Sequence, residues 1–105
     1  MSRLERLMAL LDTDPTDAEL PYMIAHEHAN TGDHEAATTW FDRCIALDAD
    51  HLYAYYHKAR SLESLDRMDD ARDTLRAGLE RARAARDAKA EGELEGFLSQ
   101  LADLV

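Results

Sequence analysis

Histidine is the residue type in this chain most suited to binding a metal ion, and there are five histidines. His26 and His28 flank Glu27, but residues two apart on a helix point roughly 200° apart and do not face one ion. A His-Glu-x-x-His helix motif is absent, and so is any pair of cysteines. We therefore expect no metal site and no cofactor. Metal binding stays as an alternative, and it would draw on His26, His28, His34, His51 and His57.

No catalytic set of residues stands out. The sequence has no glycine-rich phosphate loop and no evident nucleophile–base–acid combination, so we expect a protein that is not an enzyme. The single cysteine, Cys44, lies on an apolar helical stripe with Ala37 and Phe41, which favours packing over a reactive thiol. One cysteine cannot form an internal disulfide, and no apolar run is long enough to cross a membrane. These features predict a cytoplasmic protein without a membrane partner.

Tyr53, Tyr56 and Arg60 have the spacing that puts side chains on one face of a helix. Tyrosine offers a broad contact area with a polar tip, and arginine forks onto a carboxylate. This face therefore suits an extended peptide. An alternative is that Tyr22 and Tyr56 only pack between neighbouring helices.

Acidic residues dominate the charge of the chain. There are 22 Asp and Glu against 12 Lys and Arg, for a net charge of −10. Such a surface repels phosphate backbones, so we expect no nucleic-acid partner and favour a protein or peptide, especially a basic one. Only two of the basic residues are lysines. High Asp with scarce Lys is typical of proteins that work in concentrated salt, and ordinary compositional drift is the alternative.

Apolar spacing is helical almost throughout, and alternation with a period of two is absent. The sequence predicts six helices, over residues 3–12, 18–31, 34–47, 51–65, 69–85 and 88–104. Their predicted N-terminal caps are a Ser2–Glu5 capping box, Thr16 or Asp17, Asp33, Asp50 and Asp87. Gly32 is expected to end the second helix, with Asp66 at the equivalent place after the fourth.

The chain matches itself at an offset of 34 residues. Tyr22 then lies over Tyr56, and Phe41 over Leu75. Two pairs of small residues also coincide, which are Ala25 with Ala59 and Ala37 with Ala71. A fixed period near 34 residues indicates stacked helical hairpins, because one hairpin cannot bury its apolar face alone.

These two hairpins resemble tetratricopeptide repeats. The four alanines occupy the family's small positions, and the segment NTGDHEAA at residues 30–37 is typical of its turns. Lys58 departs from the pattern, because it occupies a site where an apolar residue is expected. The resemblance implies an all-α, right-handed α-solenoid of antiparallel hairpins. It divides the single domain 1–105 into an N-terminal half-repeat helix (1–15), two repeats (16–50 and 51–86) and a C-terminal capping helix (87–105).

In this family the first helix of each hairpin lines a concave groove. The groove residues that the resemblance implies are Glu19, Tyr22, His26, Asn30, Tyr53, Tyr56, Arg60 and Ser64. Tyr22 and His26 stand where family members that clamp a C-terminal carboxylate have other residues, so such a clamp is disfavoured. The implied function is a non-catalytic interaction module or scaffold that binds a peptide or a partner protein in the groove.

Self-association is the structural alternative. Two full repeats fall below the usual three that such arrays need for stability. A homodimer closed by the terminal helices, or through Trp40, would make up the deficit. Otherwise Trp40 is expected to lie half-buried against the preceding helix or hairpin.

Overall fold

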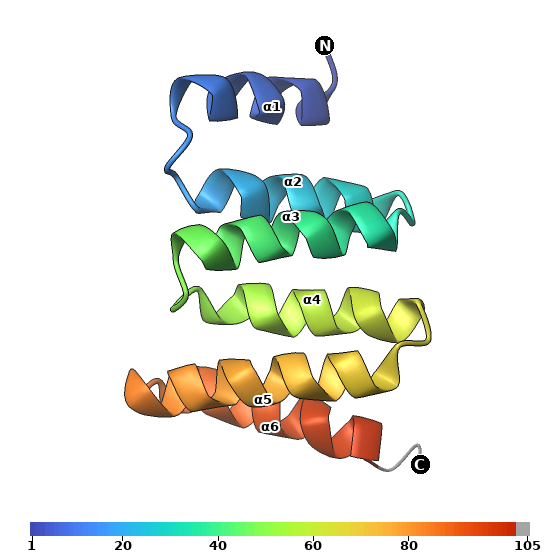
Figure 1. Cartoon of the computed structure of the whole chain (residues 1–105), viewed down its shortest axis with the longest axis vertical. Helices are drawn as coiled ribbons and strands as arrows, with labels where there is room; N and C mark the ends of the chain where they lie inside the picture. The colour runs from blue at the N-terminus through green and yellow to red at the C-terminus, as the bar shows by residue number, and fades with distance from the viewer. Residues whose placement is uncertain (103–105) are drawn as a thin grey trace.

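The computed structural model describes residues 1–102, and in them the chain forms six helices joined by short turns. Figure 1 shows these helices stacked in chain order along the longest axis of the molecule. They are α1 (Arg3–Thr13), α2 (Glu19–Asn30), α3 (His34–Leu47), α4 (Leu52–Ser64), α5 (Met68–Ala84) and α6 (Ala88–Ala102). The predicted all-α fold is confirmed. The last predicted residues of the sixth helix, 103 and 104, lie outside the described residues.

Three predicted helix caps are confirmed. The Ser2–Glu5 capping box is formed at the start of α1. The side chain of Asp33 accepts a hydrogen bond from the Ala36 N–H at 3.2 Å, and that of Asp87 accepts from the Ala90 N–H at 3.0 Å. Each bond satisfies a backbone donor that has no partner within its helix.

The second and fourth helices begin differently. Asp17 accepts from the Glu19 N–H at 3.0 Å, although the residue at the cap position of α2 is Ala18. The predicted cap at Asp50 is wrong, because His51 occupies the cap position of α4 and its side chain makes no capping bond. The Asp50 carboxylate instead accepts from Arg81 Nη1 of α5 at 3.3 Å.

The turns after α2, α4 and α5 share one backbone conformation. Gly32, Asp66 and Arg86 all have a positive φ, of 84°, 59° and 56°. In each turn the following N–H bonds back to a carbonyl five residues earlier, as Asp33 does to His28 at 2.9 Å. This is how a helix ends in a left-handed residue and satisfies its last carbonyls. The predicted equivalence of Asp66 to Gly32 is confirmed, and Arg86 makes the turn before α6 without a glycine or proline.

The four small residues of the self-match lie where helices meet. Ala25, Ala37, Ala59 and Ala71 are fully buried, and Phe41 and Leu75 fill the same place in successive hairpins. Cys44 is also fully buried beside Phe41, which raises the pKa of its thiol to about 12. Its predicted packing role is confirmed. The predicted division at residues 15/16, 50/51 and 86/87 falls between helices and stays a prediction.

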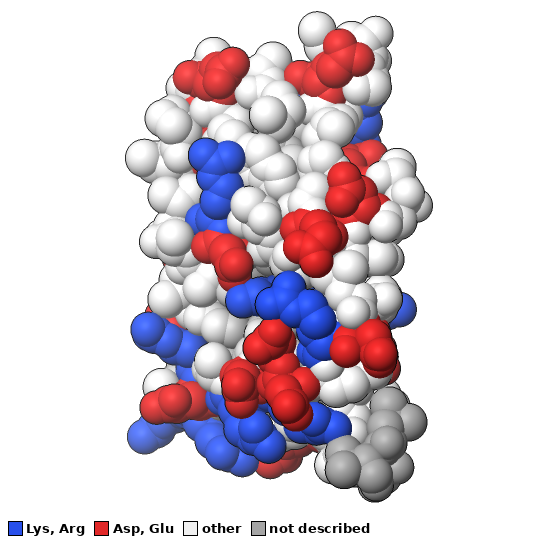
Figure 2. Space-filling model, turned by 45° about the vertical axis from the view of Figure 1, so that its right-hand side comes forward, with Lys and Arg blue, Asp and Glu red and all other residues white. Residues whose placement is uncertain are grey.

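Charged side chains are unevenly spread. In the view of Figure 2 most Lys and Arg side chains lie in the lower half, interleaved with acids. Along α5, Arg72 pairs with Asp69 at 2.8 Å and Arg76 with Asp73 at 3.3 Å. Lys58, the departure from the repeat pattern, is explained by an ion pair of 2.7 Å with Asp42 of α3.

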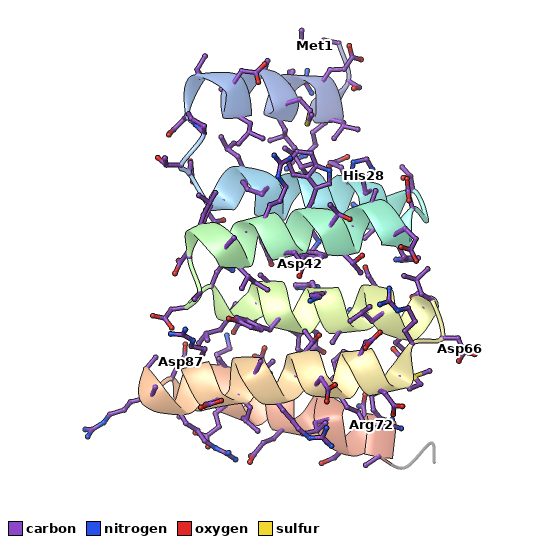
Figure 3. All side chains as sticks on the ribbon, viewed as in Figure 1. Met1, His28, Asp42, Asp66, Arg72 and Asp87 are labelled. Carbon is purple, nitrogen blue, oxygen red and sulfur yellow. The ribbon has the colours of Figure 1, made fainter. Side chains whose placement is uncertain are left out.

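Side chains fill the gap that the ribbon leaves between α1 and α2, as Figure 3 shows. Leu7 of α1 is buried against Leu20 and Ile24 of α2, and Trp40 packs on the same cluster. Trp40 is half-buried, as predicted, with the Arg43 guanidinium 4.4 Å from its ring centroid. No helix within residues 1–102 is long and apolar enough to cross a membrane.

Candidate binding groove

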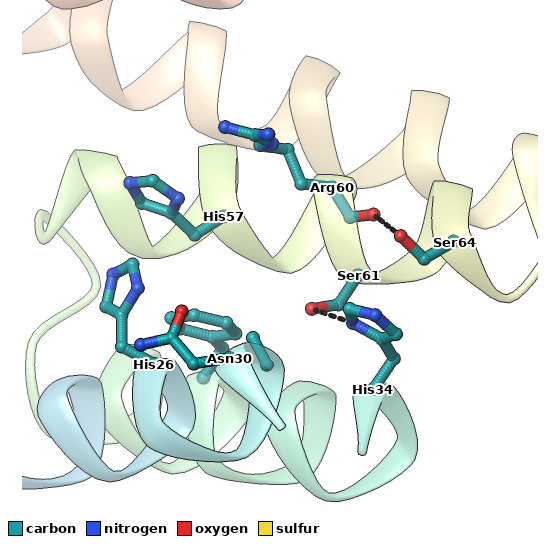
Figure 4. Close-up of a pocket in the computed structure, with 9 residues that line it drawn as sticks. His26, Asn30, His34, His57, Arg60, Ser61 and Ser64 are labelled. Atoms are coloured by element: carbon teal, nitrogen blue, oxygen red, sulfur yellow. Dashed lines mark hydrogen bonds between the residues drawn. The ribbon is translucent and has the colours of Figure 1, made fainter. Parts of the chain in front are cut away.

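A cleft of about 260 Å³ opens between α2 and α4, with α3 as its floor. Figure 4 shows its polar side chains converging from the last turns of α2, the start of α3 and the second half of α4. It is lined by His26, Ala29, Asn30, His34, Phe41, His57, Arg60, Ser61 and Ser64. Because three helices contribute, stacking of the two hairpins creates the cleft.

Half of the predicted groove residues meet here. His26 and Asn30 come from α2, and Arg60 and Ser64 come from α4. Asn30, Arg60 and Ser64 are exposed, and His26 is half-buried. Ser64 donates its hydroxyl to the Arg60 carbonyl at 3.1 Å, and Figure 4 shows the Arg60 guanidinium pointing away from Ser64. Whether these residues bind a ligand stays a prediction.

Glu19 and Tyr22 lie beyond the cleft, near the start of α2. The exposed Glu19 carboxylate contacts His51 Nε2, at the start of α4. The Tyr22 ring is half-buried, 4.4 Å from the His51 ring and 4.6 Å from the His26 ring, centroid to centroid. Burial, and then the charge of Glu19, raises the pKa of Tyr22 to about 12. Tyr22 therefore packs between α2 and α4.

Tyr53 and Tyr56 are not among the residues that line the cleft. Tyr56 packs against the core of α4–α6, with its ring 5.1 Å from that of Phe97. Both tyrosines are half-buried. Tyr53, Tyr56 and Arg60 therefore do not form one binding face, because Tyr56 packs against α6 while Arg60 lines the cleft.

His57, His34 and Ser61 are cleft residues that the sequence reasoning did not select. The His57 ring lies 4.4 Å from the His26 ring, and His34 Nδ1 is hydrogen-bonded to Ser61 Oγ at 3.2 Å. The sequence contained a signal for two of them, His57 and Ser61. Positions 57, 61 and 64 are three and four residues apart and share one helix face with each other.

Two histidines of the cleft, His26 and His57, are held in the neutral form at pH 7. Burial, followed by the charges of His26, Arg60 and His51, lowers the pKa of His57 to about 4. Burial and then Arg60 lower the pKa of His26 as well. A neutral imidazole offers one N–H donor and one acceptor, so these two rings bring hydrogen-bonding groups to the cleft while Arg60 brings a positive charge.

The histidines do not assemble a metal centre in the part of the chain that the structure describes. No three His, Cys, Asp or Glu side chains in residues 1–102 are placed so that they could hold one ion.

A family model agrees with the helical repeats. Residues 2–78 match the model described as anaphase-promoting complex, cyclosome, subunit 3, which covers most of the chain from α1 into α5. The structure is also similar to a tetratricopeptide-repeat domain protein from Salinibacter ruber, with a TM-score of 0.80 and 33% identity over 87% of this chain and 92% of the other. The chain belongs to this family of tetratricopeptide-repeat proteins.

Two further relatives extend the comparison of this tetratricopeptide-repeat protein. An uncharacterized protein of Methanocaldococcus jannaschii, MJ0572, is 33% identical over 66% of this chain and 80% of its own. The type III secretion translocator chaperone SycD of Yersinia enterocolitica has a TM-score of 0.84 at 14% identity, over 94% of this chain and 69% of its own. At that identity the likeness to SycD shows the fold alone.

Proposed function

We propose that this chain is a protein-interaction module, without catalytic activity, that binds a peptide or an extended segment of a partner protein. The observation that carries this proposal is the cleft of about 260 Å³ between α2 and α4. Repeat arrays of stacked hairpins use such concave surfaces for binding. The translocator chaperone SycD has the same fold.

The proposed contacts are the exposed polar side chains of the cleft, with half-buried residues at its edges. Asn30, Arg60 and Ser64 would contact the segment directly, beside His26. Glu19, Tyr22, Tyr53 and Tyr56 would extend the surface along the first helices of the hairpins. A protein partner is favoured over nucleic acid by the net charge of −10. The buried, free thiol of Cys44 supports a reducing cytoplasm as the compartment.

Affinity capture with matched surface variants tests the proposal. The groove variant carries Asn30→Ala and Arg60→Ala, both at exposed positions. The control variant carries Arg76→Ala and Glu80→Ala, which are exposed on α5 and outside the cleft. Each is compared with the wild-type chain by quantitative mass spectrometry of proteins captured from the host lysate at native salt.

We expect one or more proteins to be captured by the wild-type chain and by the control variant, and to be lost with the groove variant. Equal capture by all three chains would contradict the proposed groove. Melting curves of both variants serve as the check on folding, because exposed polar substitutions away from caps change stability little.

Self-association is the second candidate, and exposed apolar residues favour it. Met8 is 40% exposed, Leu10 53% and Leu47 44%. A second cleft, of about 450 Å³, lies between α1 and α3 beside Trp40 and Leu47. A homodimer formed through the face that holds this second cleft would cover Leu47 and Trp40. A strictly monomeric mass in light scattering at tens of micromolar protein would remove this candidate.

A further inference from the structure

The cleft between α2 and α4 differs in charge from the rest of the molecule. Of the 105 residues in the chain, 22 are Asp or Glu, yet the residues that line this cleft include no acid. They include Arg60 and three histidines. At physiological salt, charges further than about 8 Å are largely screened. Among the side chains that line the cleft, Arg60 therefore carries a positive charge, while the Glu27 carboxylate acts on the His26 ring from outside the lining.

Three acids near the cleft in sequence are engaged with cations outside it, whereas Glu63 of α4, three residues from Arg60, has no ion pair within residues 1–102. Glu27 of α2 pairs with Arg3 at 2.7 Å, and Glu19 contacts His51. At the start of α3, Glu35 lies 4.0 Å from Arg67. None of these carboxylates is among the groups that line the cleft. The acids that border the cleft thus leave its interior open to a carboxylate from another molecule.

The Arg60 guanidinium has no carboxylate within 4.0 Å in the part of the chain that the structure describes. Seven other Lys and Arg residues in residues 1–102 pair with acids, including Arg81 with Asp50 at 3.3 Å, and four do not. Arg60 differs from those four because it lines the cleft. Arg60 is exposed at the edge of the cleft, and in Figure 4 its guanidinium points away from Asn30, which lies on α2 at the other side. An exposed arginine side chain can swing over the cleft, where it offers two parallel N–H donors to a carboxylate, and the Asn30 amide adds a third.

His26 and His57 stand beside Arg60 as a pair of half-buried rings, 4.4 Å apart. The titratable and charged groups around them are Tyr22 and Glu27 from α2, His34 from α3, and His51, Tyr56 and Arg60 from α4 and its cap. Burial lowers both histidine pKa values most, and the positive charge of Arg60 and of the neighbouring histidines lowers them further. A carboxylate placed among them acts in the other direction, because an opposite charge favours the protonated ring.

We propose that the cleft receives an Asp or Glu side chain of the bound segment, held by Arg60 and Asn30, and that the His26–His57 pair takes up a proton as the carboxylate enters. The proposal rests on the proposed function and specifies an acidic segment as its ligand. The cleft of about 260 Å³ holds several times the roughly 30 Å³ share of one water molecule, which is room for a carboxylate side chain. The site differs from a clamp for a chain terminus, since an internal acidic side chain suffices.

A peptide selection identifies the ligand chemistry. A random library of displayed 12-residue peptides is selected on the wild-type chain at pH 7 and physiological salt. We expect peptides enriched in Asp and Glu. Their affinity should fall about tenfold or more with Arg60→Gln, as for loss of a charged hydrogen bond, and stay unchanged with Arg76→Gln. Selection on Arg60→Glu should no longer enrich acids.

The proton uptake has its own readout. From pH 7.5 to 5.5 the peptide carboxylates stay ionised, so tighter binding at the lower pH reports the histidines. We expect affinity for an acidic peptide to rise several-fold in the wild-type chain and with His28→Gln, which lies outside the cleft, and to stay level with His57→Gln. Proton NMR titration of the wild-type rings supplies a test without substitution, with the His26 and His57 pKa values expected to rise on peptide binding.

The outcomes separate the two proposals. If no peptide binds, or if binding ignores both Arg60→Gln and Asn30→Ala, the groove is not a peptide site and the proposed function fails. If peptides bind at the groove without acidic enrichment, the function stands and the acidic ligand is overturned. If acidic peptides bind with no change of affinity between pH 7.5 and 5.5 and no shift of either ring, the proton uptake is overturned.

Discussion

His57 illustrates how one residue links the stacking of the hairpins to pH. Its ring lies between α2 and α4, near the His26 ring and the Arg60 guanidinium. In the unfolded chain a histidine has a pKa near 6.5, whereas burial in the fold lowers the pKa of His57 to about 4. Between these two values the unfolded chain binds the proton and the folded chain does not.

Stability should therefore fall as the pH is lowered from 6.5 towards 4. The reason is that the free energy of unfolding rises with pH wherever the unfolded state binds more protons. Urea unfolding at a series of pH values measures the slope. The same series on His57→Gln should give a shallower slope in this window, whatever its stability at pH 7. An identical slope in both proteins would mean that His57 does not couple folding to protons.

At the scale of the elements, helix packing depends on a single missing side chain. Gly78 of α5 lies against Tyr55 of α4, and a Cβ at Gly78 would stand 2.7 Å from the Tyr55 Cβ. That atom is fixed to the backbone and cannot swing aside. Tyr55 is itself anchored, since its hydroxyl donates to the Ala49 carbonyl at 2.7 Å. Glycine at this position thus sets how closely α4 and α5 approach.

Gly78→Ala should destabilise the fold, although alanine is the better helix former. Overpacking costs about 1–3 kcal/mol and the gain in helix propensity is about 1 kcal/mol, so we expect a net loss of about 1 kcal/mol. Gly92→Ala is the matched control, because nothing lies within 4 Å of a Cβ at that position of α6. It should stabilise by up to about 1 kcal/mol. Urea unfolding of both variants gives the comparison, and equal effects would refute the close approach.

Several element boundaries could be predicted because their signals are local. The caps at Ser2, Asp33 and Asp87 each satisfy a donor within three residues, so the sequence contains both partners. The cap predicted at Asp50 failed for the opposite reason. Its carboxylate pairs with Arg81, which is 31 residues away, and only the fold brings that cation near.

At the scale of the whole molecule, the acidic charge is concentrated in the first half and at the end. Residues 1–59 have a net charge of −7, and residues 60–89 one of +1. The Arg76–Asp73 pair of α5 is exposed, and the Arg72–Asp69 pair is exposed at its aspartate, and such pairs contribute little to stability. The repulsion among unpaired acids is therefore the charge effect that dissolved salt can change most.

Potassium chloride should raise the melting temperature of the chain. The salt concentration up to which the melting temperature keeps rising distinguishes simple charge screening from a surface suited to concentrated salt. Simple screening is largely complete by a few tenths molar, where the Debye length is already below 8 Å. If the acidic surface is suited to concentrated salt, stabilisation should continue to rise into the molar range. Thermal melts at pH 7 from 0.05 to about 3 M KCl measure it. A plateau at low salt would leave compositional drift as the explanation of the acidic composition.

The sequence by itself determined the features that depend on near neighbours along the chain. Helix periodicity and capping predicted six helices, because these signals lie within a few turns of one another. The 34-residue spacing of Ala25, Ala37, Ala59 and Ala71 predicted that four of the helices form two stacked hairpins. Tertiary structure alone decided which polar side chains meet. The rotation of α4 about its axis turns His57 and Ser61 into the cleft and Tyr56 towards Phe97. That rotation is set by packing against α3, α5 and α6 together, and a face that several helices share is not encoded in the spacing of any one of them.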